Sequence, residues 1–321
     1  MILLLESLHA AAEALLAAEA PLLRAEDPSG PPEDLADVRA IVTRGRGRIT
    51  EALMARCPAL AVIARAGAGL DNLDTAAAAR RGVPVIFAPG ANTNTVAEHT
   101  LALMLDLSRG VTRDARAVAA GRWEDRARYR GDELGGRTLG VIGFGSIGQR
   151  VATLASAFGM RVVVAEHAGA TARARVEADA GEAAYTRLPL AALLAESDIV
   201  SLHVPLTPST EHMLGAAELA QLRPGALLVN TARGALIDMP ALRAALQSGA
   251  LGGFAADVLD AEPPAANEPL LSLENVVLTP HVASLTAATY RALCVSTAAN
   301  VARVLRGDAP EPRSVFRRRE A

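Results

Sequence analysis

A glycine-rich turn at residues 138–148 constrains the fold of this chain more than any other stretch. The apolar run Leu139–Ile142 has the character of a buried strand, and it is followed by Gly143, Gly145 and Gly148 at the spacing GxGxxG. The first glycine permits a tight turn, the second lets the backbone approach a pyrophosphate, and the third lets a following helix lie close to the strand. The N–H groups at the start of that helix then favour an anion, because the helix dipole is positive there.

The residues beyond the turn complete a dinucleotide-binding pattern. Apolar residues recur at helical spacing over 151–158, and a second apolar run, Val162–Ala165, ends at Glu166. A carboxylate at this place accepts both hydroxyls of an adenosine ribose and repels a 2′-phosphate, so NAD is expected rather than NADP. A lone GxGxxG also occurs as a structural turn in other α/β proteins, but here both strands, the helix and the acid accompany it. Three nearby basic residues weaken the preference for NAD: His167, Arg173 and Arg175.

The charged residues exclude several chemistries. All 32 basic residues are arginine, which excludes a lysine Schiff base, a pyridoxal phosphate anchor and the lysine of a phosphate-binding loop. Guanidinium remains as the permanent side-chain cation, and it suits carboxylates and phosphates. The formal net charge of −3 gives no general case for a nucleic-acid partner.

Cysteine content and hydropathy bear on the compartment. Cys57 and Cys294 are too few for a disulfide framework or a metal cluster, so no metal is predicted and a reducing cytoplasm fits. The apolar N-terminus carries no early basic residue and is interrupted by Glu6 and Glu13, which makes it a poor signal peptide. Apolar runs stay well short of the ~18 residues that a membrane span needs, so none is expected.

The length of 321 residues suits about two domains. Short apolar runs before the glycine turn predict a separate α/β domain over residues 1–97. Its strand candidates are Ile2–Leu5, Arg39–Val42, Ala61–Ala64 and Val83–Phe87. A long helix is expected over 96–120 with a break near Gly110. Within it, His99 is interpreted as a packing or solvated residue rather than a catalytic one.

Strands and helices alternate regularly from residue 138 to residue 278. Six strands are expected, the count of a full dinucleotide-binding domain, at 139–142, 162–165, 198–204, 226–229, 252–256 and 276–278. The stretch between 166 and 198 is rich in Ala and Arg and is predicted to be helical. A last helix is expected over about 284–305.

Three segments that follow predicted strands carry side chains suited to hydride transfer. Functional loops of such a sheet lie at the carboxyl ends of the strands, and there the sequence supplies Arg233, Glu262 and His281. A guanidinium can hold the carboxylate of a 2-keto acid and polarise its carbonyl, while an imidazole can exchange the alcohol proton near neutral pH. A neighbouring carboxylate orients the ring and favours imidazolium. Arg233 is therefore predicted to bind substrate, His281 to be the acid–base and Glu262 to be its partner, although each alone also suits an ordinary loop.

The loop that opens with Arg65 is a candidate anion site in the first domain. Glycines in this loop, which runs to Asn72, can present backbone N–H groups to an anion. An ordinary turn after a strand explains the same spacing equally well.

The chain resembles the D-isomer-specific 2-hydroxyacid dehydrogenase family, most closely its phosphoglycerate dehydrogenase-like branch. The matching stretches follow the family order over nearly the whole chain: 65–72, 92–98, 143–148, 203–207, 230–238, 256–258, 262–263 and 279–281. The family's catalytic Arg, Glu and His fall on Arg233, Glu262 and His281, in agreement with the roles argued from the residues. The resemblance implies an α/β protein of two Rossmann-like domains, each a doubly wound parallel sheet, with the active site in a cleft between them that closes on binding.

Further assignments follow from the resemblance. It implies a discontinuous substrate-binding domain, 1–97 plus 285–321, and an NAD-binding domain, 98–284. The substrate carboxylate is expected at the backbone of Gly67, Ala68 and Gly69, with Asn92 and Arg233 nearby. Cofactor contacts are expected from Gly143, Gly145, Ser146, Ile147, Gly148, Glu166, His203, Val204, Pro205, Thr231, Ala232, Arg233, Asp257 and His281. Homodimers through the cofactor domain are usual in such proteins.

The sequence leaves the substrate open. In the phosphoglycerate branch, the positions that match Arg44 and Arg65 lie near a distal phosphate, so one hypothesis is a substrate with a second anionic group, such as phosphate or sulfonate. The other is that these arginines are solvated on their loops. A glyoxylate or hydroxypyruvate reductase, or a dehydrogenase of a small inorganic or one-carbon acid, is an alternative within the same family. An NAD-sensing binding protein or corepressor on the same fold is an alternative of another class, although the complete Arg, Glu and His set favours catalysis.

Overall fold

The computed structural model describes residues 1–166, 176–177 and 184–317. The chain divides into two compact units: Met1–Asn92 with Ser284–Ala321, and Thr93–Ala283. The sequence places these boundaries after residues 97 and 284. None of the helices in the described ranges is both long and apolar enough to cross a membrane.

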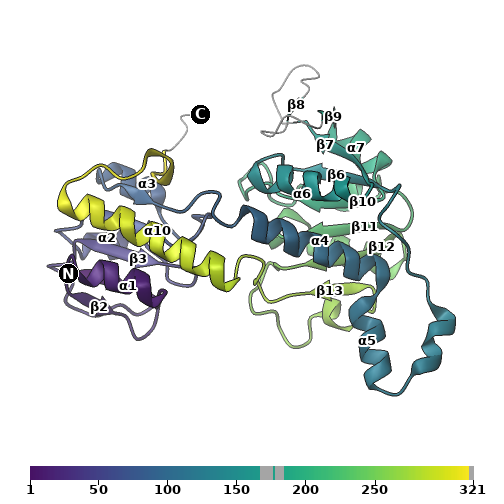
Figure 1. The fold of residues 1–321 in the computed structure, drawn as a ribbon, viewed down its shortest axis with the longest axis horizontal. Coiled ribbons are helices and arrows are strands. Elements are labelled where there is room, and N and C mark those ends of the chain that lie inside the picture. Colours follow the sequence, from purple (N-terminus) through teal and green to yellow (C-terminus); the bar gives the residue numbers. More distant parts are fainter. Residues whose placement is uncertain (167–175, 178–183, 318–321) are drawn as a thin grey trace. The chain divides into compact units, whose positions relative to one another are not determined.

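The first unit is a parallel sheet, with five strands among the described residues, covered by helices on both faces (Figure 1). Its elements are β1 (Ile2–Leu4), α1 (Ala10–Ala17), β2 (Leu22–Arg24), β3 (Ala40–Thr43), α2 (Glu51–Ala55), β4 (Val62–Arg65), α3 (Thr75–Arg80), β5 (Val85–Ile86), α10 (Ala287–Arg306) and the 3₁₀ turn η4 (Pro312–Ser314). The strand order is β2-β1-β3-β4-β5. Helices α1 and α10 pack on one face through Leu16 and Cys294, and α2 and α3 pack on the other through Met54 and Ala77.

The four strands predicted for the first unit are confirmed, and β2 is an addition. This strand has three residues, none of them buried, so its own sequence gives only a weak signal. Its parallel pairing with β1 is what defines it.

The second unit is a larger sheet, with eight strands in the part of the chain that the structure describes (Figure 1). Its elements are α4 (Thr93–Arg109), α5 (Val111–Ala119), η1 (Trp123–Arg128), β6 (Thr138–Ile142), α6 (Ser146–Ala157), β7 (Arg161–Ala165), β8 (Val176–Glu177), β9 (Ala184–Leu188), α7 (Leu190–Glu196), β10 (Ile199–Leu202), α8 (Ala216–Leu219), β11 (Ala226–Asn230), η2 (Gly234–Leu236), α9 (Met239–Gln247), β12 (Leu251–Ala256), η3 (Pro269–Ser272) and β13 (Val276–Leu278). The predicted break near Gly110 is confirmed, because this residue has φ 65° between α4 and α5.

The second unit has two strands beyond the six that the sequence predicts, and the helix predicted between residues 166 and 198 is confirmed only over α7 within the described residues. Strand β9 pairs parallel to β7, and β8 pairs antiparallel to β9. The Ala-rich composition favours helix, but Tyr185 on β9 is buried and packs edge-on against Phe144, with ring centroids 5.5 Å apart. Tertiary packing of an aromatic residue has therefore overridden the local propensity.

The sheet of the second unit reverses its winding beside β6. The strand order is β13-β12-β11-β10-β6-β7-β9-β8, so β6 lies between β10 and β7. Helices α4 and α6 cover one face, and α7 and α9 cover the other. In sheets of this kind, the loops at the carboxyl ends of the strands beside the reversal form the ligand crevice. The segments that follow β6, β7, β10, β11, β12 and β13 all lie at that edge, because all of these strands are parallel.

Candidate active site

The glycine turn after β6 has the geometry that its sequence predicts. Gly143 has φ 99°, and a Cβ there would lie 2.5 Å from the carbonyl carbon of His203. A Cβ on Gly148 would overlap the carbonyl oxygen of Gly143, so the start of α6 can lie on the turn only because residue 148 is glycine. A Cβ on Gly145 would meet no heavy atom within 4 Å. The backbone at Gly145 therefore borders open space, as the close approach of a pyrophosphate requires.

The start of α6 and the end of β7 supply the other two groups that a dinucleotide needs. Ser146 and Ile147 are the first residues of the twelve-residue helix α6, whose first-turn N–H groups have no partner within the helix. Glu166 directly follows β7, the neighbour of β6, and its N–H donates to the carbonyl of Leu188 at 2.9 Å. These residues fit an adenine dinucleotide. The basic residues expected to weaken the preference for NAD, namely His167, Arg173 and Arg175, lie outside the described residues.

The segment after β10 faces the same turn through its backbone. The His203 N–H donates to the carbonyl of Ile142 at 2.7 Å, and the His203 ring lies 2.8 Å from the hydroxyl of Ser201. Burial lowers the pKa of His203 to about 4, so this imidazole is neutral at pH 7. Val204 is partly buried and Pro205 is exposed.

The loop after β11 is fixed by Asn230. The buried Asn230 side chain accepts from the N–H of Ala232 at 2.9 Å and donates to the carbonyl of Arg233 at 2.7 Å. Arg233 is extended, with φ −146°, and its Nη1 donates to the carbonyl of Ala232 at 2.6 Å. A Cβ on Gly234 would overlap the backbone of Leu259, so this glycine lets the Arg233 loop pack on the loop that leads to Glu262.

Glu262 and His281 are in direct contact. Their atoms Oε2 and Nδ1 lie 2.7 Å apart, and Glu262 Oε1 accepts from the N–H of Leu259 at 3.0 Å. His281 has φ 55°, a left-handed conformation that turns its side chain out of the strand direction, and half of that side chain is exposed. Because Nδ1 is held by Glu262, Nε2 is the ring nitrogen that can face a ligand.

The charges around this pair favour an imidazolium beside a carboxylate. The hydrogen bond that His281 donates to Glu262 raises the pKa of His281 above its usual range, burial opposes this rise, and the charge of Asp257 adds to it while that of Arg233 reduces it. Burial raises the pKa of Glu262, but hydrogen bonds from His281 and from the Leu259 N–H outweigh it, so the net pKa is lowered. The charge of Arg233 lowers both pKa values, which places its guanidinium near both groups. The structure therefore brings the three predicted catalytic residues together.

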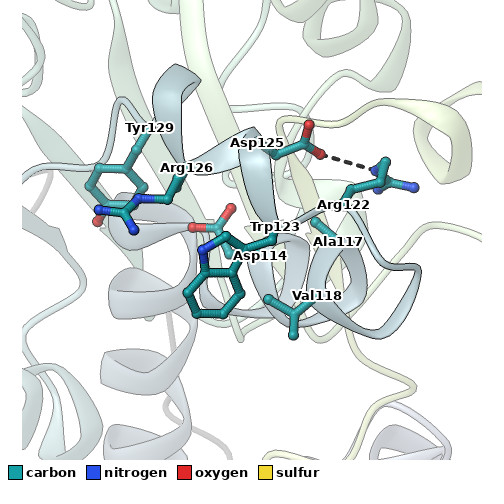
Figure 2. Close-up of a pocket in the computed structure, with 8 residues that line it drawn as sticks. All are labelled: Asp114, Ala117, Val118, Arg122, Trp123, Asp125, Arg126 and Tyr129. Carbon is teal, nitrogen blue, oxygen red and sulfur yellow. Dashed lines mark hydrogen bonds and ion pairs between the residues drawn. The ribbon is translucent and has the colours of Figure 1, made fainter.

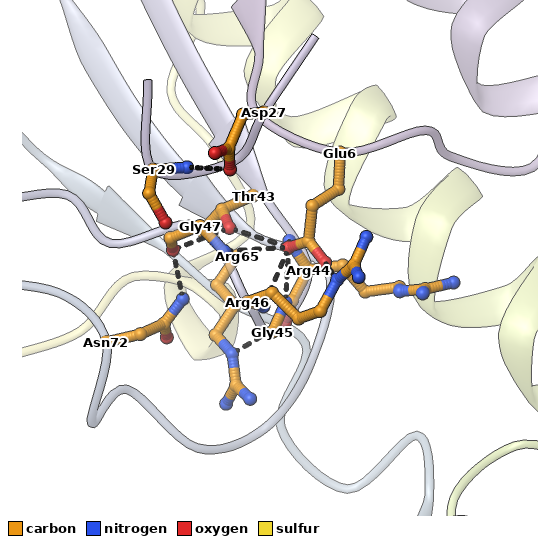
Figure 3. A network of polar contacts seen from close by, with 10 residues as sticks. All are labelled: Glu6, Asp27, Ser29, Thr43, Arg44, Gly45, Arg46, Gly47, Arg65 and Asn72. Carbon is orange, nitrogen blue, oxygen red and sulfur yellow. Dashed lines mark hydrogen bonds and ion pairs between the residues drawn. The ribbon is translucent and has the colours of Figure 1, made fainter. Parts of the chain in front are cut away.

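In the first unit, the loop after β3 already surrounds an anion, the carboxylate of Glu6 (Figure 3). Glu6 Oε2 accepts from the N–H groups of residues 44, 45, 46 and 47 at 2.7–3.3 Å, and from the hydroxyl of Thr43 at 3.0 Å. Burial raises the pKa of Glu6, but the four backbone hydrogen bonds outweigh it and lower the pKa to about 2. This nest of N–H groups was not foreseen from the sequence, which placed an anion-binding backbone in the loop after β4.

Arg44 and Arg65, the two arginines expected near a second anionic group of the substrate, both contact residues of the first unit. Arg65 donates from Nε to the carbonyl of Arg44 at 2.8 Å and from Nη1 to the carbonyl of Gly69, so it ties the two loops together. Arg44 lies over the ring of Tyr290, 5.3 Å from its centroid. The N–H of Gly67 donates to the carbonyl of Arg65 at 2.9 Å, and the partly buried Ala68 and Gly69 follow it. The side-chain oxygen of Asn92 is buried without a hydrogen-bond partner among the described residues.

Comparison with known proteins decides the family. Residues 101–283 match the model of the D-isomer specific 2-hydroxyacid dehydrogenase, NAD binding domain. The chain is 40% identical over 257 residues to the hydroxypyruvate reductase of Thermotoga maritima, covering 79% of this chain and 81% of that one. The chain belongs to this family. Its second unit is an NAD-binding domain, and its two-sheet fold is that of the family's NAD-dependent oxidoreductases.

Other members of the 2-hydroxyacid dehydrogenase family are similarly related. The chain is 39% identical over 288 residues to the D-3-phosphoglycerate dehydrogenase of Methanocaldococcus jannaschii, covering 87% of this chain and 52% of that one. It thus spans about half the length of that relative. The structure of the D-lactate dehydrogenase of Aquifex aeolicus in complex with NAD and lactic acid superposes with a TM-score of 0.85, with 29% identity and 96% of each chain covered.

Sequence reasoning missed the polar contacts around His99. Its Nε2 lies 3.0 Å from the hydroxyl of Thr279 and 3.6 Å from Asp257 Oδ1, on the segment that leads to His281. The interpretation of His99 as a packing or solvated residue therefore overlooked a polar network. The Asp257 side chain, expected to line the cofactor site, is 1% exposed and accepts from Thr279, from Val282 and from Ala283.

Proposed function

We propose that this protein interconverts a small D-2-hydroxy acid and its 2-keto acid with NAD as the redox partner. The observation that carries the proposal is the contact of 2.7 Å between His281 Nδ1 and Glu262 Oε2, at the sheet edge that also holds the glycine turn. Bound NADH supplies the hydride. A histidine alone would suit many loops, but a histidine paired with a carboxylate and lying near a guanidinium matches the needs of keto-acid reduction.

Three charged residues of the second unit have different roles in this reaction. The Arg233 guanidinium binds the substrate carboxylate with two parallel N–H donors and polarises the neighbouring carbonyl. His281, protonated on both nitrogens, donates the Nε2 proton to the oxygen on which negative charge develops. Glu262 keeps Nδ1 protonated and fixes the ring plane, so the same ring returns as the base when the hydroxy acid is oxidised.

A screen of the purified protein tests this function. NADH and NADPH would each be offered with glyoxylate, hydroxypyruvate, pyruvate, phosphohydroxypyruvate and sulfopyruvate, and the loss of reduced cofactor would be followed by absorbance. NADH oxidation with at least one of these acids supports the proposal, and a preference for NADH over NADPH supports the assignment of Glu166 to the ribose. Tight NADH binding without turnover of any acid would instead favour an NAD-sensing protein.

The proposal extends to a substrate that carries a second anionic group, bound by Arg44 of the first unit. Two relatives mark the alternatives, because one is named for a phosphorylated acid and the other for hydroxypyruvate. Arg44 is only partly buried, and its guanidinium is held over Tyr290. Arg65, by contrast, binds two backbone carbonyls of its own unit, so we assign it to shaping the two loops around the substrate rather than to the second anion.

Replacing Arg44 with alanine will therefore raise KM for phosphohydroxypyruvate by about tenfold or more, with less than about a twofold change for pyruvate, because one charge-assisted hydrogen bond contributes roughly 1.5–3 kcal/mol. Steady-state kinetics with both acids would measure this. Arg48→Ala, an exposed arginine of the same loop, is the matched control. An equal effect of Arg44→Ala on both acids would rule out the second anion.

We further propose a cytoplasmic homodimer formed through the second unit. Two observations support it: both cysteines are free and buried, and α5 with η1 exposes Val118 and Trp123 by more than half. These two side chains line a pocket of about 390 Å³ together with charged and aromatic neighbours (Figure 2). An exposed cluster of this kind is typical of a protein interface.

Replacing Trp123 with alanine will shift the protein toward monomer at dilutions where the natural chain is still dimeric, because buried tryptophans contribute about 2 kcal/mol or more at interfaces. Sedimentation velocity over a dilution series would show the shift. Leu271→Ala removes another exposed apolar side chain of the same unit and is expected to have no effect. A natural chain that stays monomeric at every concentration would contradict the proposal.

A further inference from the structure

Two adjacent residues of helix α4, His99 and Thr100, reach two different loops of the candidate active site. His99 Nε2 lies 3.0 Å from the hydroxyl of Thr279, two residues before His281. Thr100 Oγ1 lies 2.9 Å from the hydroxyl of Thr231, two residues before Arg233. One helix therefore contacts both of the segments that carry the reactive side chains, from one turn of its surface.

The direction of the first chain of hydrogen bonds is fixed by chemistry. A carboxylate only accepts, so the single proton of the Thr279 hydroxyl is donated to Asp257 Oδ1, at 2.6 Å. The Thr279 oxygen must then accept from His99, which requires a proton on Nε2 of that ring. His99 thus acts as a donor at the start of a chain that ends on a buried carboxylate.

The second chain runs in the opposite direction, toward the helix. The hydroxyl of Thr100 donates to the carbonyl of Val96 at 2.8 Å, within α4. Because a hydroxyl has one proton, the contact between Thr100 and Thr231 is a donation from Thr231. Thr100 is fully buried, so both of its hydrogen bonds are shielded from water.

Asp257 links helix α4 to the backbone on both sides of His281. Its carboxylate accepts from Thr279 on one side, and from the N–H groups of Val282 at 2.9 Å and Ala283 at 2.7 Å on the other. His281 is bracketed by these anchors and has a left-handed backbone, a conformation that persists only where the surroundings enforce it.

We propose that His99 and Thr100 are positioning residues that hold the His281 loop and the Arg233 loop at a fixed separation for the reaction. This inference rests on the proposed function. The proton donor and the carboxylate clamp must meet one small substrate at the same time, and misplacement of either by a fraction of an ångström is costly. A shared helix sets their separation more rigidly than two independent loops would.

The variants His99→Leu and Thr279→Val test the first chain, and Thr100→Val tests the second. Each is expected to lower kcat by about tenfold, within the range that supporting hydrogen bonds contribute, while KM for NADH changes by less than about twofold. His99→Gln, which restores a donor, and Thr279→Ser, which restores the hydroxyl, should recover most of the rate. Ser108→Ala is the matched control for Thr100→Val, because it removes a hydroxyl from a buried site on the same helix that has no hydrogen-bond partner among the described residues.

A second readout does not depend on turnover. The pKa of the His281 ring, followed by NMR of the ¹³C-labelled histidines in the full chain with NADH bound, reports the charges that face it, namely Glu262, Asp257 and Arg233. When the loop that carries His281 is loosened, the contact between His281 and Glu262 weakens. The pKa of His281 should therefore fall in His99→Leu and Thr279→Val but not in Ser108→Ala. Unchanged kcat and unchanged ring pKa in the folded His99 and Thr279 variants would overturn the inference. Full turnover by His281→Ala would overturn the proposed function instead, whatever the ring pKa shows.

Discussion

Replacing His281 with alanine will lower kcat for keto-acid reduction by about 10²–10⁴-fold, the usual contribution of a positioned general acid. Glu262 does not replace the lost Nε2 proton, because it is a carboxylate that accepts from the Leu259 N–H. NADH affinity should change far less than kcat, because the glycine turn is untouched. Stopped-flow kinetics and NADH fluorescence would measure the two quantities separately.

His212 provides a matched control for this change. It is another histidine of the second unit with a left-handed backbone, with φ 50° against 55° for His281. His212→Ala therefore carries the same local backbone cost without removing a proton donor. Equal loss of kcat in the two variants would show that backbone strain, and not proton transfer, explains the effect.

The His281–Glu262 pair determines how the reaction rate depends on pH. Reduction needs the protonated ring, so its rate is high below the pKa of His281 and falls as pH rises through that pKa. Because the hydrogen bond donated to Glu262 raises this pKa above its ordinary 6.5, the falling limb should lie above 6.5. Oxidation of the hydroxy acid needs the neutral ring and should rise along the same limb. In Glu262→Gln the limb should move to lower pH.

Substituting alanine at two glycines of one turn will separate folding from cofactor binding. Gly148→Ala places a Cβ on the carbonyl oxygen of Gly143, which is backbone and cannot rotate away. The start of α6 must then lift from β6, and we expect a loss of roughly 3 kcal/mol in the free energy of unfolding. Gly145→Ala places its Cβ in open space, so stability should change by less than about 1 kcal/mol while NADH affinity falls by about tenfold or more.

Urea unfolding and NADH titration on both variants would measure this contrast. Gly145→Ala serves as the control for Gly148→Ala, because the chemical change is the same and only the neighbours differ. If Gly145→Ala binds NADH as the natural chain does, the pyrophosphate does not approach the turn as proposed. If Gly148→Ala unfolds no more readily, the close packing of α6 on the turn is not what residue 148 provides.

The sequence predicted the parts of the fold that depend on local patterns. The strands around Val141 and Val163 read as apolar runs because parallel strands are buried on both faces, and the break at Gly110 followed from a single residue. Strand β9 could not be found in this way, since the contact between Tyr185 and Phe144 joins residues 41 positions apart. Strand β2 depends likewise on its partner β1, not on its own three residues.

In the candidate site, too, only the residues with a local sequence signal could be predicted. Arg233, Glu262 and His281 could be proposed because each follows a strand and each has a side chain suited to one step. The role of His99 could not be predicted in this way. Adjacent residues of a helix point in different directions, and only the folded structure shows which residues each of them contacts. The Glu6 carboxylate was missed for a similar reason, since 37 to 41 residues separate it from the groups that bind it.

Glu6 makes the conformation of the loop that carries Arg44 and Arg46 dependent on pH. The pKa of this carboxyl is about 2 in the fold, against an ordinary 4.5. The stabilisation that the anion gives is therefore complete above 4.5 and is withdrawn as pH falls toward 2. A protonated Glu6 can no longer accept from four N–H groups and the Thr43 hydroxyl at full strength. Acid would thus weaken the arginine loop from within, by removing the negative charge around which its backbone is wound.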